Sequence, residues 1–300
     1  AGATVPPQLA RAGYSVCLVE RRTFPRETLC GEFLSHEVVG IIRDLGIDRE
    51  FFSLGPSPIT RLTLCADHGP MVSEPLGFTA YGLKRGAFDQ LLLNTAIKNG
   101  VHVLQPADAE EIIRSGEDFE IHYRMNDTPL TLQSRWCIGA YGKTSPLDKR
   151  LRRPFAGART RLNGIKFHVP SPALTGISAD EIRIFTGPGM YCGVNHVDGG
   201  LATICFLERR AGDNLPPRAR LRELMAANRH FAYVMGRSAI AAVGDAPIYG
   251  TGNIFFGIRN LVEKGVFMIG DAGRVISPLG GDGIGMELQS AQLLGALFGV

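Results

Sequence analysis

The sequence predicts an α/β fold in which a Rossmann-like nucleotide-binding part is interleaved with an antiparallel β-sheet. Near the C-terminus, an apolar strand at 266–269 leads through a Gly-Asp turn and a glycine loop into a helix. Near the N-terminus, a second apolar strand ends on the acidic residue Glu20. Between them, residues 164–209 alternate apolar and polar side chains, which is typical of strands with one packed face. Because the nucleotide-binding signals lie at opposite ends of the chain, we expect that part to be discontinuous.

The composition is ordinary for a globular protein with a sizeable core. The 300 residues are 45% hydrophobic and 20% charged, and no run approaches the roughly 18 apolar residues of a membrane span. A net charge of +3 gives no argument for nucleic acid, although Arg152-Arg153 and Arg209-Arg210 suit an acidic substrate or a peripheral membrane contact. The six cysteines form no C-x-x-C pair, so we expect reduced thiols in a cytoplasm and no metal site. We also expect no signal peptide.

The C-terminal loop has the outline of a cofactor site. Glycines that lead into a helix let backbone N–H groups and the positive end of the helix dipole converge on an electron-rich ligand. The carboxylate of Asp271, at the end of the strand, can accept hydrogen bonds from ligand hydroxyls. The helix that follows shows one apolar face, formed by Ile284, Leu288, Ala291 and Leu294.

Residues 270–291 read GDAGRVISPLGGDGIGMELQSA. This pattern resembles the GDA-x(5)-P-x-x-GxG segment of the glutathione-reductase-type flavoproteins. Within that group, the pattern resembles the branch with the para-hydroxybenzoate hydroxylase-like fold, which includes flavin monooxygenases and geranylgeranyl reductases. The resemblance implies that Asp271 binds the ribityl and pyrophosphate part of FAD. It also implies that the loop covers the edge of the flavin ring, with contacts from Pro278, Gly280, Gly281, Gly283 and Ile284.

The N-terminal segment resembles the second half of a dinucleotide-binding βαβ unit. In that unit the acid at the strand end holds the ribose of the adenosine, so Glu20 and its neighbour Arg21 are implied FAD contacts. Gly2 matches the last glycine of a G-x-G-x-x-G loop, and no strand precedes it. The sequence therefore predicts an N-terminally truncated flavoprotein that lacks the first strand. Pro6-Pro7 predict either a helix that starts after them or an atypical N-terminus.

Residues 24–35 read FPR-x(3)-CGE-x-L-S, which is similar to a segment that passes beside the flavin in geranylgeranyl reductases. The resemblance makes Cys30 a candidate catalytic residue, and the alternative is a buried small hydrophobe. Arg26 and Glu32 are expected to make ordering contacts. Residues 58–80 alternate as in a sheet strand and are expected to start the substrate domain.

Residues 85–92 match the R-x-x-F-D-x-x-L element of the same family at a helix start. The resemblance implies that Arg85 contacts FAD, with a surface salt bridge as the alternative, while Asp89 is expected to pair within the helix. A short buried strand is predicted at 101–104, and the family implies that residues after it, including Ala107, touch the adenine through backbone atoms. A β-meander is predicted over 109–135.

Residues 136–145 correspond to a loop that reads I-G-A-D-G-x-x-S in relatives, with Tyr141 in place of the aspartate. That replacement puts a pyridine-nucleotide interaction in question. The basic stretch 149–153 is predicted to be a solvated helix end, and contact with an anionic substrate or NADPH is the alternative.

The strands within 164–209 are expected to form the sheet that covers the flavin in the resembling proteins. Lys166 and His168 share one face of a strand. On another strand Tyr191 is the second candidate catalytic residue, although most such residues only line a wall. The Y-x-W-x-F-P motif of geranylgeranyl reductases is replaced by YCGVN at 191–195, and residues 218–236 predict one basic amphipathic helix.

The predicted FAD-binding domain comprises 1–57, 78–155 and 250–300, and the substrate domain comprises 58–77 and 156–249. The resemblance implies an FAD-dependent oxidoreductase that acts on a small apolar or aromatic substrate, with NAD(P)H as a transient reductant. The first hypothesis is reduction of prenyl-type C=C bonds. The alternatives are an NAD(P)H-dependent aromatic or polyketide monooxygenase, and an inactive or incomplete flavoprotein fragment. The oligomeric state is open.

Overall fold

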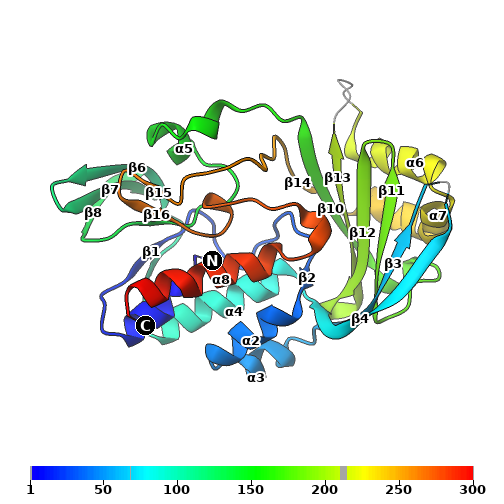
Figure 1. Ribbon diagram of the computed structural model, residues 1–300, viewed down its shortest axis with the longest axis horizontal. Helices are drawn as coiled ribbons and strands as arrows, with labels where there is room; N and C mark the ends of the chain where they lie inside the picture. Colours follow the sequence, from blue (N-terminus) through cyan, green and yellow to red (C-terminus); the bar gives the residue numbers. More distant parts are fainter. Residues whose placement is uncertain (1, 68, 210–214, 300) are drawn as a thin grey trace.

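The computed structural model describes residues 2–67, 69–209 and 215–299. Of the basic pair noted above, Arg210 lies outside these residues. The described chain forms one eight-stranded sheet and three smaller sheets. Figure 1 shows the large sheet on one side of the molecule, and helices with the smaller sheets on the other. No helix in the described ranges is both long and apolar enough to cross a membrane.

The large sheet, here the main sheet, is mixed. Its strands run in the order β14 (Tyr249–Thr251), β10 (Leu162–Pro170), β13 (Leu201–Arg209), β12 (Met190–Val197), β11 (Glu181–Gly187), β3 (Ser57–Cys65), β4 (Met71–Gly82) and β2 (Phe33–Leu34). Neighbours are antiparallel except β11 and β3, which are parallel. The predicted antiparallel sheet is thus present, with this one parallel pair as the difference. The chain reaches β11 from β3 by a long crossover through the rest of the molecule, and such connections allow parallel pairing.

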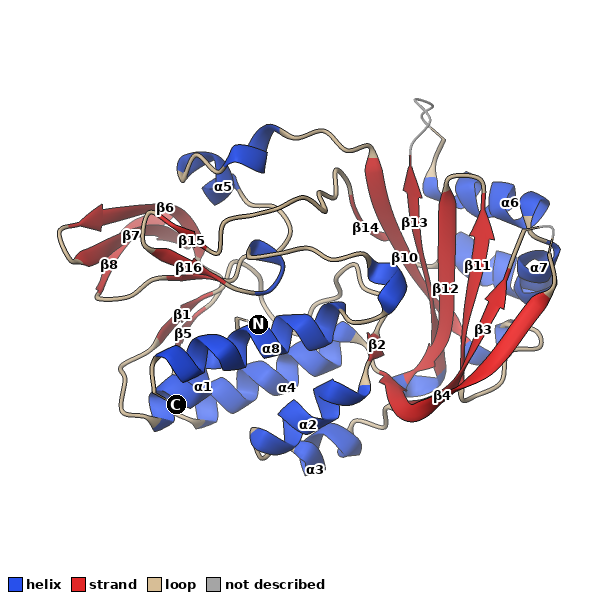
Figure 2. Cartoon of the chain, viewed as in Figure 1, coloured by secondary structure: helices blue, strands red, loops and turns tan. Residues whose placement is uncertain are grey.

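The two faces of the main sheet differ in chemistry because side chains alternate along each strand. On the outer face, apolar side chains such as Phe167, Phe185 and Ile204 form one buried cluster with α6 (Pro217–Ala227) and α7 (Arg229–Asp245). Figure 2 shows these helices against that face. The opposite, inner face carries Lys166, His168, Thr203 and Cys205 from β10 and β13. The outer face therefore supplies the core.

The single helix predicted over 218–236 is in fact two, and this is a correction. Asn228 leaves the helical conformation between α6 and α7. Its Nδ2 donates to the carbonyl oxygens of Cys65 (2.9 Å) and Thr186 (3.0 Å), and its Oδ1 accepts from the N–H of Phe231 (3.0 Å). These bonds to the sheet outweigh the local preference for a continuous helix.

The other side of the molecule carries α1 (Val5–Arg11), α2 (His36–Asp44), α3 (Asp48–Ser53), α4 (Arg85–Lys98) and α8 (Gly283–Leu297). The predicted apolar face of α8 is buried. Helix α1 begins before Pro6-Pro7, which corrects the expectation that a helix would start after them. Prolines fit there because first-turn N–H groups have no partner within a helix.

The small sheets sit beside these helices. β1 (Cys17–Val19) pairs in parallel with β5 (His102–Leu104) alone, so β5 is only partly buried, contrary to the prediction for 101–104. β9 (Ile138–Gly139) pairs in parallel with β16 (Val266–Met268), next to β15 (Val262–Glu263). The predicted meander is confirmed as β6 (Asp108–Ser115), β7 (Asp118–Met125) and β8 (Thr128–Ser134).

Short helical elements complete the chain. They are α5 (Pro146–Arg150), η1 (Pro154–Gly157), η2 (Ser171–Ala173), η3 (Asp198–Gly200), η4 (Gly270–Ala272) and η5 (Pro278–Gly280). All six cysteines are free thiols, as the sequence indicates. The boundaries of the two domains stay a prediction.

Candidate functional site

The C-terminal loop begins where two parallel strands end together. Ile138 pairs with Phe267 and Gly139 with Met268, so the chain leaves β9 and β16 at the same edge. Asp271 in η4 follows β16, and Lys143 follows β9. Lys143 Nζ lies 2.7 Å from Asp271 Oδ2. The strand register therefore places a cation from one loop on the acid of the other.

The glycine loop lies against the segment that contains Cys30. Pro278 opens η5, Gly280 ends it, and Gly281 follows with φ of 75°. A Cβ at Gly281 would stand 2.9 Å from the ring of Phe33, so this position needs glycine for space as well as for conformation. Gly283 is the first residue of α8, and Ile284 is buried in the core beneath it.

Arg85 and Glu287 close the loop from two helices. Arg85, the first residue of α4, donates to both carboxylate oxygens of Asp89 (3.0 and 3.2 Å), which confirms the predicted pairing of Asp89 within the helix. Its Nη2 lies 3.9 Å from Glu287 Oε2 in α8. We call Arg85, Lys143, Asp271 and Glu287 the loop cluster.

The two acids of the loop cluster share one polar site. Burial raises the pKa of Asp271, and the neighbouring charge of Glu287 adds to the rise. Burial also opposes ionisation of Glu287, but the positive charges of Arg85 and Lys143 outweigh it and lower the pKa of Glu287. Of the two carboxyl groups, that of Asp271 is therefore the harder to ionise.

Tyr141 has a structural place in this chain. Its hydroxyl donates to Asp148 Oδ1 (3.0 Å) and accepts from Arg153 Nη1 (3.1 Å). The same Nη1 donates to the carbonyl oxygen of Ala272 in η4 (2.9 Å). Arg153 is 2% exposed, so the prediction of a solvated helix end for 149–153 is wrong at this residue. Its hydrogen bonds to groups distant in sequence compensate its burial.

The expected adenosine contacts form a separate group. Glu20 and Ala107 meet where β1 and β5 end, because the Ala107 N–H donates to the Glu20 carbonyl oxygen (2.8 Å). The Glu20 carboxylate accepts from the N–H of Arg22 (2.8 Å), and Arg21 is exposed. Gly2 lies beside Ala140, whose Cβ would be 3.3 Å from a Cβ at Gly2. The structure thus brings Gly2 to the loop that holds Lys143.

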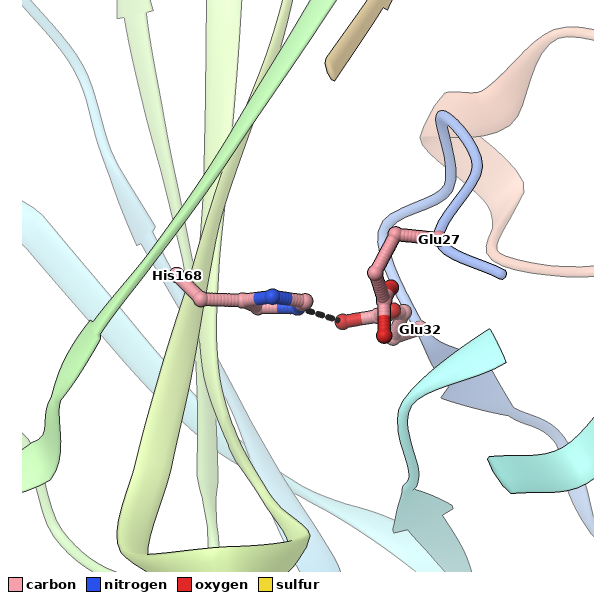
Figure 3. A group of neighbouring side chains, drawn as sticks. All are labelled: Glu27, Glu32 and His168. Carbon is pink, nitrogen blue, oxygen red and sulfur yellow. Dashed lines mark hydrogen bonds and ion pairs between the residues drawn. The ribbon is translucent and has the colours of Figure 1, made fainter. Parts of the chain in front are cut away.

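A buried network of charges joins the Cys30 segment to the inner face, and sequence reasoning missed it. Lys166 Nζ donates to Glu27 Oε2 (2.8 Å) and Glu32 Oε1 (2.7 Å). His168 Nε2 lies 2.6 Å from Glu32 Oε2, which also accepts from the hydroxyl of Thr203. Figure 3 shows the imidazole extending from β10 toward the two glutamates on the opposite segment. The expected ordering role of Glu32 agrees with these contacts.

The network keeps Glu32 ionised. Against the cost of burial, the hydrogen bond from His168 and the charge of Lys166 lower the Glu32 pKa from 4.5 to about 2. The ligand atoms of Glu27, Glu32 and His168 lie within 4.8 Å of one another, a spacing that suits a metal ion. The ammonium of Lys166 already bonds both carboxylates, so the chain itself supplies the balancing positive charge.

The two candidate catalytic residues border the same inner face. Cys30 Sγ accepts from the N–H of Glu32 (3.3 Å), and Cys205 lies opposite Lys166 on the neighbouring strand. Burial raises the pKa of Cys205 to about 12, and nearby Cys30 adds to the rise. Tyr191 shares this face with Cys205, and burial raises the pKa of its hydroxyl. Cys30 and Tyr191 as catalysts stay a prediction.

A protein-family model described as FAD binding domain matches residues 1–299. The chain belongs to this FAD-binding family. Its mixed main sheet with a β-meander is the architecture of para-hydroxybenzoate hydroxylase-like flavoproteins. The predicted family, fold and FAD cofactor are therefore confirmed.

The glycine loop has the groups that FAD requires. Helix α8 begins without a side-chain cap from Asp282, so that carboxylate leaves the first N–H groups to a ligand. Asp271 offers a carboxyl group for ribityl hydroxyls. Lys143 and Arg85 offer positive charge for the pyrophosphate. The contacts of Asp271 and Arg85 with FAD stay predictions.

Two curated relatives match by sequence. A 1H-pyrrole-2-carbonyl peptidyl-carrier protein brominase of Pseudoalteromonas luteoviolacea is 27% identical over 160 residues, which is 53% of this chain and 38% of the relative. The conditioned medium factor receptor 1 of Dictyostelium discoideum is 24% identical over 324 aligned residues, covering 97% of this chain and 60% of the relative. The flavoprotein chain thus spans less than two thirds of either relative.

Solved structures share the fold. The myxobacterial chondrochloren halogenase, an FAD-dependent enzyme, superimposes with a TM-score of 0.81 at 18% identity, covering 98% of this chain and 70% of the halogenase. A geranylgeranyl bacteriochlorophyll reductase-like protein of Thermoplasma acidophilum gives a TM-score of 0.77 at 18% identity, covering 98% of this chain and 74% of that one. At these identities the likeness concerns the fold alone.

Proposed function

We propose that this flavoprotein transfers oxygen to a small hydroxylated aromatic substrate, held between the inner face of the main sheet and the cofactor loop, with NAD(P)H as transient reductant. In such a reaction an aromatic C–H becomes C–OH, the second oxygen atom of O₂ leaves as water, and NAD(P)H supplies the two electrons. Bound FAD would supply the redox chemistry and the activation of O₂. The chain supplies binding, orientation and a proton acceptor.

The observation that carries this proposal is the pair formed by Glu32 and His168. An ionised carboxylate only accepts hydrogen bonds, so Nε2 of His168 is assigned as the donor in their 2.6 Å contact. In the tautomer that carries its proton on Nε2 alone, Nδ1 is an acceptor atom. A proton acceptor suits an aromatic hydroxyl, because a phenol that gives up its proton becomes an electron-rich ring that reacts readily with electrophilic oxygen.

The rest of the inner face also suits an aromatic ring. Tyr249 lies opposite Lys166 on the next strand, with its ring centroid 6.1 Å from that of His168. Tyr191 stands on the same face, and Gly193 beside it carries no side chain. Aromatic walls favour an aromatic ligand through stacked and edge-to-face contacts.

Reduction of a prenyl-type C=C bond is the second candidate. The CGE-x-L-S segment favours it, because Cys30 and Glu32 lie on the inner face, as the resemblance to geranylgeranyl reductases implies. An isolated alkene, however, gains little from aromatic walls, whereas Tyr191 and Tyr249 line the inner face. The inner-face geometry therefore favours oxygen transfer.

The test uses the chain reconstituted with FAD. NADPH oxidation is followed with and without O₂, in the presence of phenolic or prenyl substrates, and products are weighed by mass spectrometry. We expect NADPH oxidation that phenols stimulate, and a product with one added oxygen atom. A His168→Gln variant should keep its FAD and lose most of that stimulation.

Two results would decide against this assignment. Consumption of NADPH without O₂, with a prenyl product that has gained two hydrogens, would establish the reductase. Colourless protein that takes up no FAD would support the incomplete-fragment alternative. An exposed substitution on another element, Lys98→Met in α4, serves as the control for both measurements.

A further inference from the structure

Lys143 is a charged side chain of the cofactor loop to which neither the motifs nor the family resemblance assigns a role. It follows β9 in the loop Tyr141-Gly-Lys-Thr-Ser145. Its side chain is 31% exposed, and its ammonium lies 2.7 Å from Asp271 Oδ2. An ammonium carries three donors, and Asp271 occupies one of them. The Lys143 ammonium thus lies at the edge of the loop with N–H donors that Asp271 does not use.

The other cation of the loop cluster is more firmly held. The Arg85 guanidinium donates twice to Asp89 and lies near Glu287. Turning it toward a ligand would break a two-bond contact within its own helix. Lysine has a flexible four-carbon stem and binds anions as a compact charge, so it changes partners more easily than arginine. Lys143 is therefore the cation of the cluster that a ligand can recruit.

The charge of the loop cluster also calls for such a cation. Asp271 and Glu287 are two acids at a site that receives a pyrophosphate with negative charges of its own. Burial and the charge of Glu287 raise the pKa of Asp271, so this site favours a cation beside any further negative charge. The Tyr141 hydroxyl bonds Asp148 and Arg153, so the loop after β9 offers no carboxylate at position 141 and places the ammonium of Lys143 beside Asp271.

We propose that Lys143 is an FAD-binding residue, which leaves its contact with Asp271 to bind the pyrophosphate when the cofactor enters. Asp271 is then free to accept or donate hydrogen bonds with ribityl hydroxyls. The ion pair between Lys143 and Asp271 holds both side chains at the loop until the cofactor enters. This inference depends on FAD binding alone and not on the substrate or reaction proposed above.

The experiment compares FAD affinity among wild type, Lys143→Met, Lys143→Arg and the control Lys98→Met, whose ammonium is exposed at the far end of α4. Protein stripped of cofactor is titrated with FAD at low and high salt, and binding is followed by quenching of flavin fluorescence. Circular dichroism and thermal melting verify that each variant is folded. No substrate is needed.

We expect Lys143→Met to weaken FAD binding by about tenfold or more at low salt, Lys143→Arg to retain most of the affinity, and Lys98→Met to match wild type. The loss should shrink at high salt, because salt screens the interaction between the ammonium and the pyrophosphate. Equal affinities of Lys143→Met and Lys98→Met, or a loss that is the same at both salt concentrations, would overturn the proposal. A folded wild type that binds FAD but oxidises no NADPH would contradict the proposed function without contradicting the role of Lys143 in FAD binding.

Discussion

Glu32 has three features that each cost free energy of folding. Its side chain has no exposed surface, its carboxylate is ionised, and its backbone adopts φ of 58°, a left-handed conformation that side chains disfavour. The carboxylate also accepts from the N–H of Arg85 (2.9 Å), at the positive end of α4. With Lys166, His168 and Thr203 it therefore has four donors around it. A strained, buried and fully bonded acid points to a functional position.

Glu32→Gln should destabilise the protein by about 3 to 5 kcal/mol at neutral pH, because it leaves Lys166 as a buried cation with one carboxylate partner lost. Urea unfolding of both proteins at pH 7 measures the difference. The exposed Glu74→Gln in β4 is the matched control and should change stability by less than about 0.5 kcal/mol. If Glu32→Gln had the same free energy of unfolding as wild type, the stabilising role of the network would be contradicted.

The pH dependence has a definite sign. The folded pKa of Glu32 is lowered from 4.5 to about 2, so its contribution is present above the unfolded pKa and is lost as pH falls through that window. The shift corresponds to about 3 kcal/mol. Urea unfolding of wild type between pH 5 and about pH 2 should show that loss, and Glu32→Gln should show a flatter profile.

The sequence singled out Glu32 as an ordering contact but could not name its partners. Lys166, His168 and Thr203 lie 134, 136 and 171 residues away along the chain. Alternation along β10 predicted that Lys166 and His168 share a face. Which segment that face meets depends on tertiary packing, which periodicity does not report.

Among the elements, periodicity predicted best where one face is apolar over a long run. The apolar face of α8 and the three strands of the meander follow from such patterns. The break between α6 and α7 does not, because its cause is the set of hydrogen bonds from Asn228 to two strands. The parallel pairing of β11 with β3 likewise depends on a crossover that no local pattern encodes.

Asn228→Ala tests the break between α6 and α7. It removes the cap of α7 and leaves the carbonyl oxygens of Cys65 and Thr186 buried without this donor, so we expect a loss of about 3 kcal/mol. Urea unfolding measures it. The adjacent exposed residue gives the control, Arg229→Ala, which should stay within about 0.5 kcal/mol of wild type. FAD affinity should be the same in both variants, since Asn228 faces the outer side of the sheet.

Arg153→Lys tests the support of the cofactor loop. Arg153 links α5 to the carbonyl oxygens of Ala272 and Asn260, and a lysine cannot reproduce its fork of donors. We expect about 2 to 4 kcal/mol lower stability together with weaker FAD binding. The neighbouring Arg152 is exposed, so Arg152→Lys should leave both properties unchanged. Loss of stability without any change in FAD affinity would mean that the loop does not depend on Arg153.

At the scale of the whole molecule, the inner face and the cofactor loop are joined through one segment. Residues 27–35 contact the main sheet through Glu27 and Glu32, and they contact the glycine loop through Phe33. The resemblance predicted that this segment passes beside the flavin. That the same segment contacts both the main sheet and the glycine loop could not be predicted, because this depends on the positions of β10, β13 and α8 together.

FAD should therefore stabilise the entire fold. With FAD at one hundred times its dissociation constant, linkage predicts about 2.7 kcal/mol of added stability. Thermal unfolding at increasing FAD concentration should show a single transition that moves to higher temperature. Two transitions, of which FAD moves only one, would show instead that the main sheet unfolds independently of the cofactor loop.

The two-faced construction of the main sheet bears on how such a protein can evolve. Its outer face packs in one of the buried apolar clusters, while Tyr191 and Tyr249 on the inner face are not part of that cluster. We expect substitutions at Tyr191 and Tyr249 to alter substrate preference at the proposed site with less loss of stability than substitutions on the outer face. Lys166 and Thr203 lie on the same face, but we expect substitutions there to be poorly tolerated. Each of the two residues donates a hydrogen bond to the buried carboxylate of Glu32. We therefore expect specificity to depend on positions around this ionic centre and not on the charges within it.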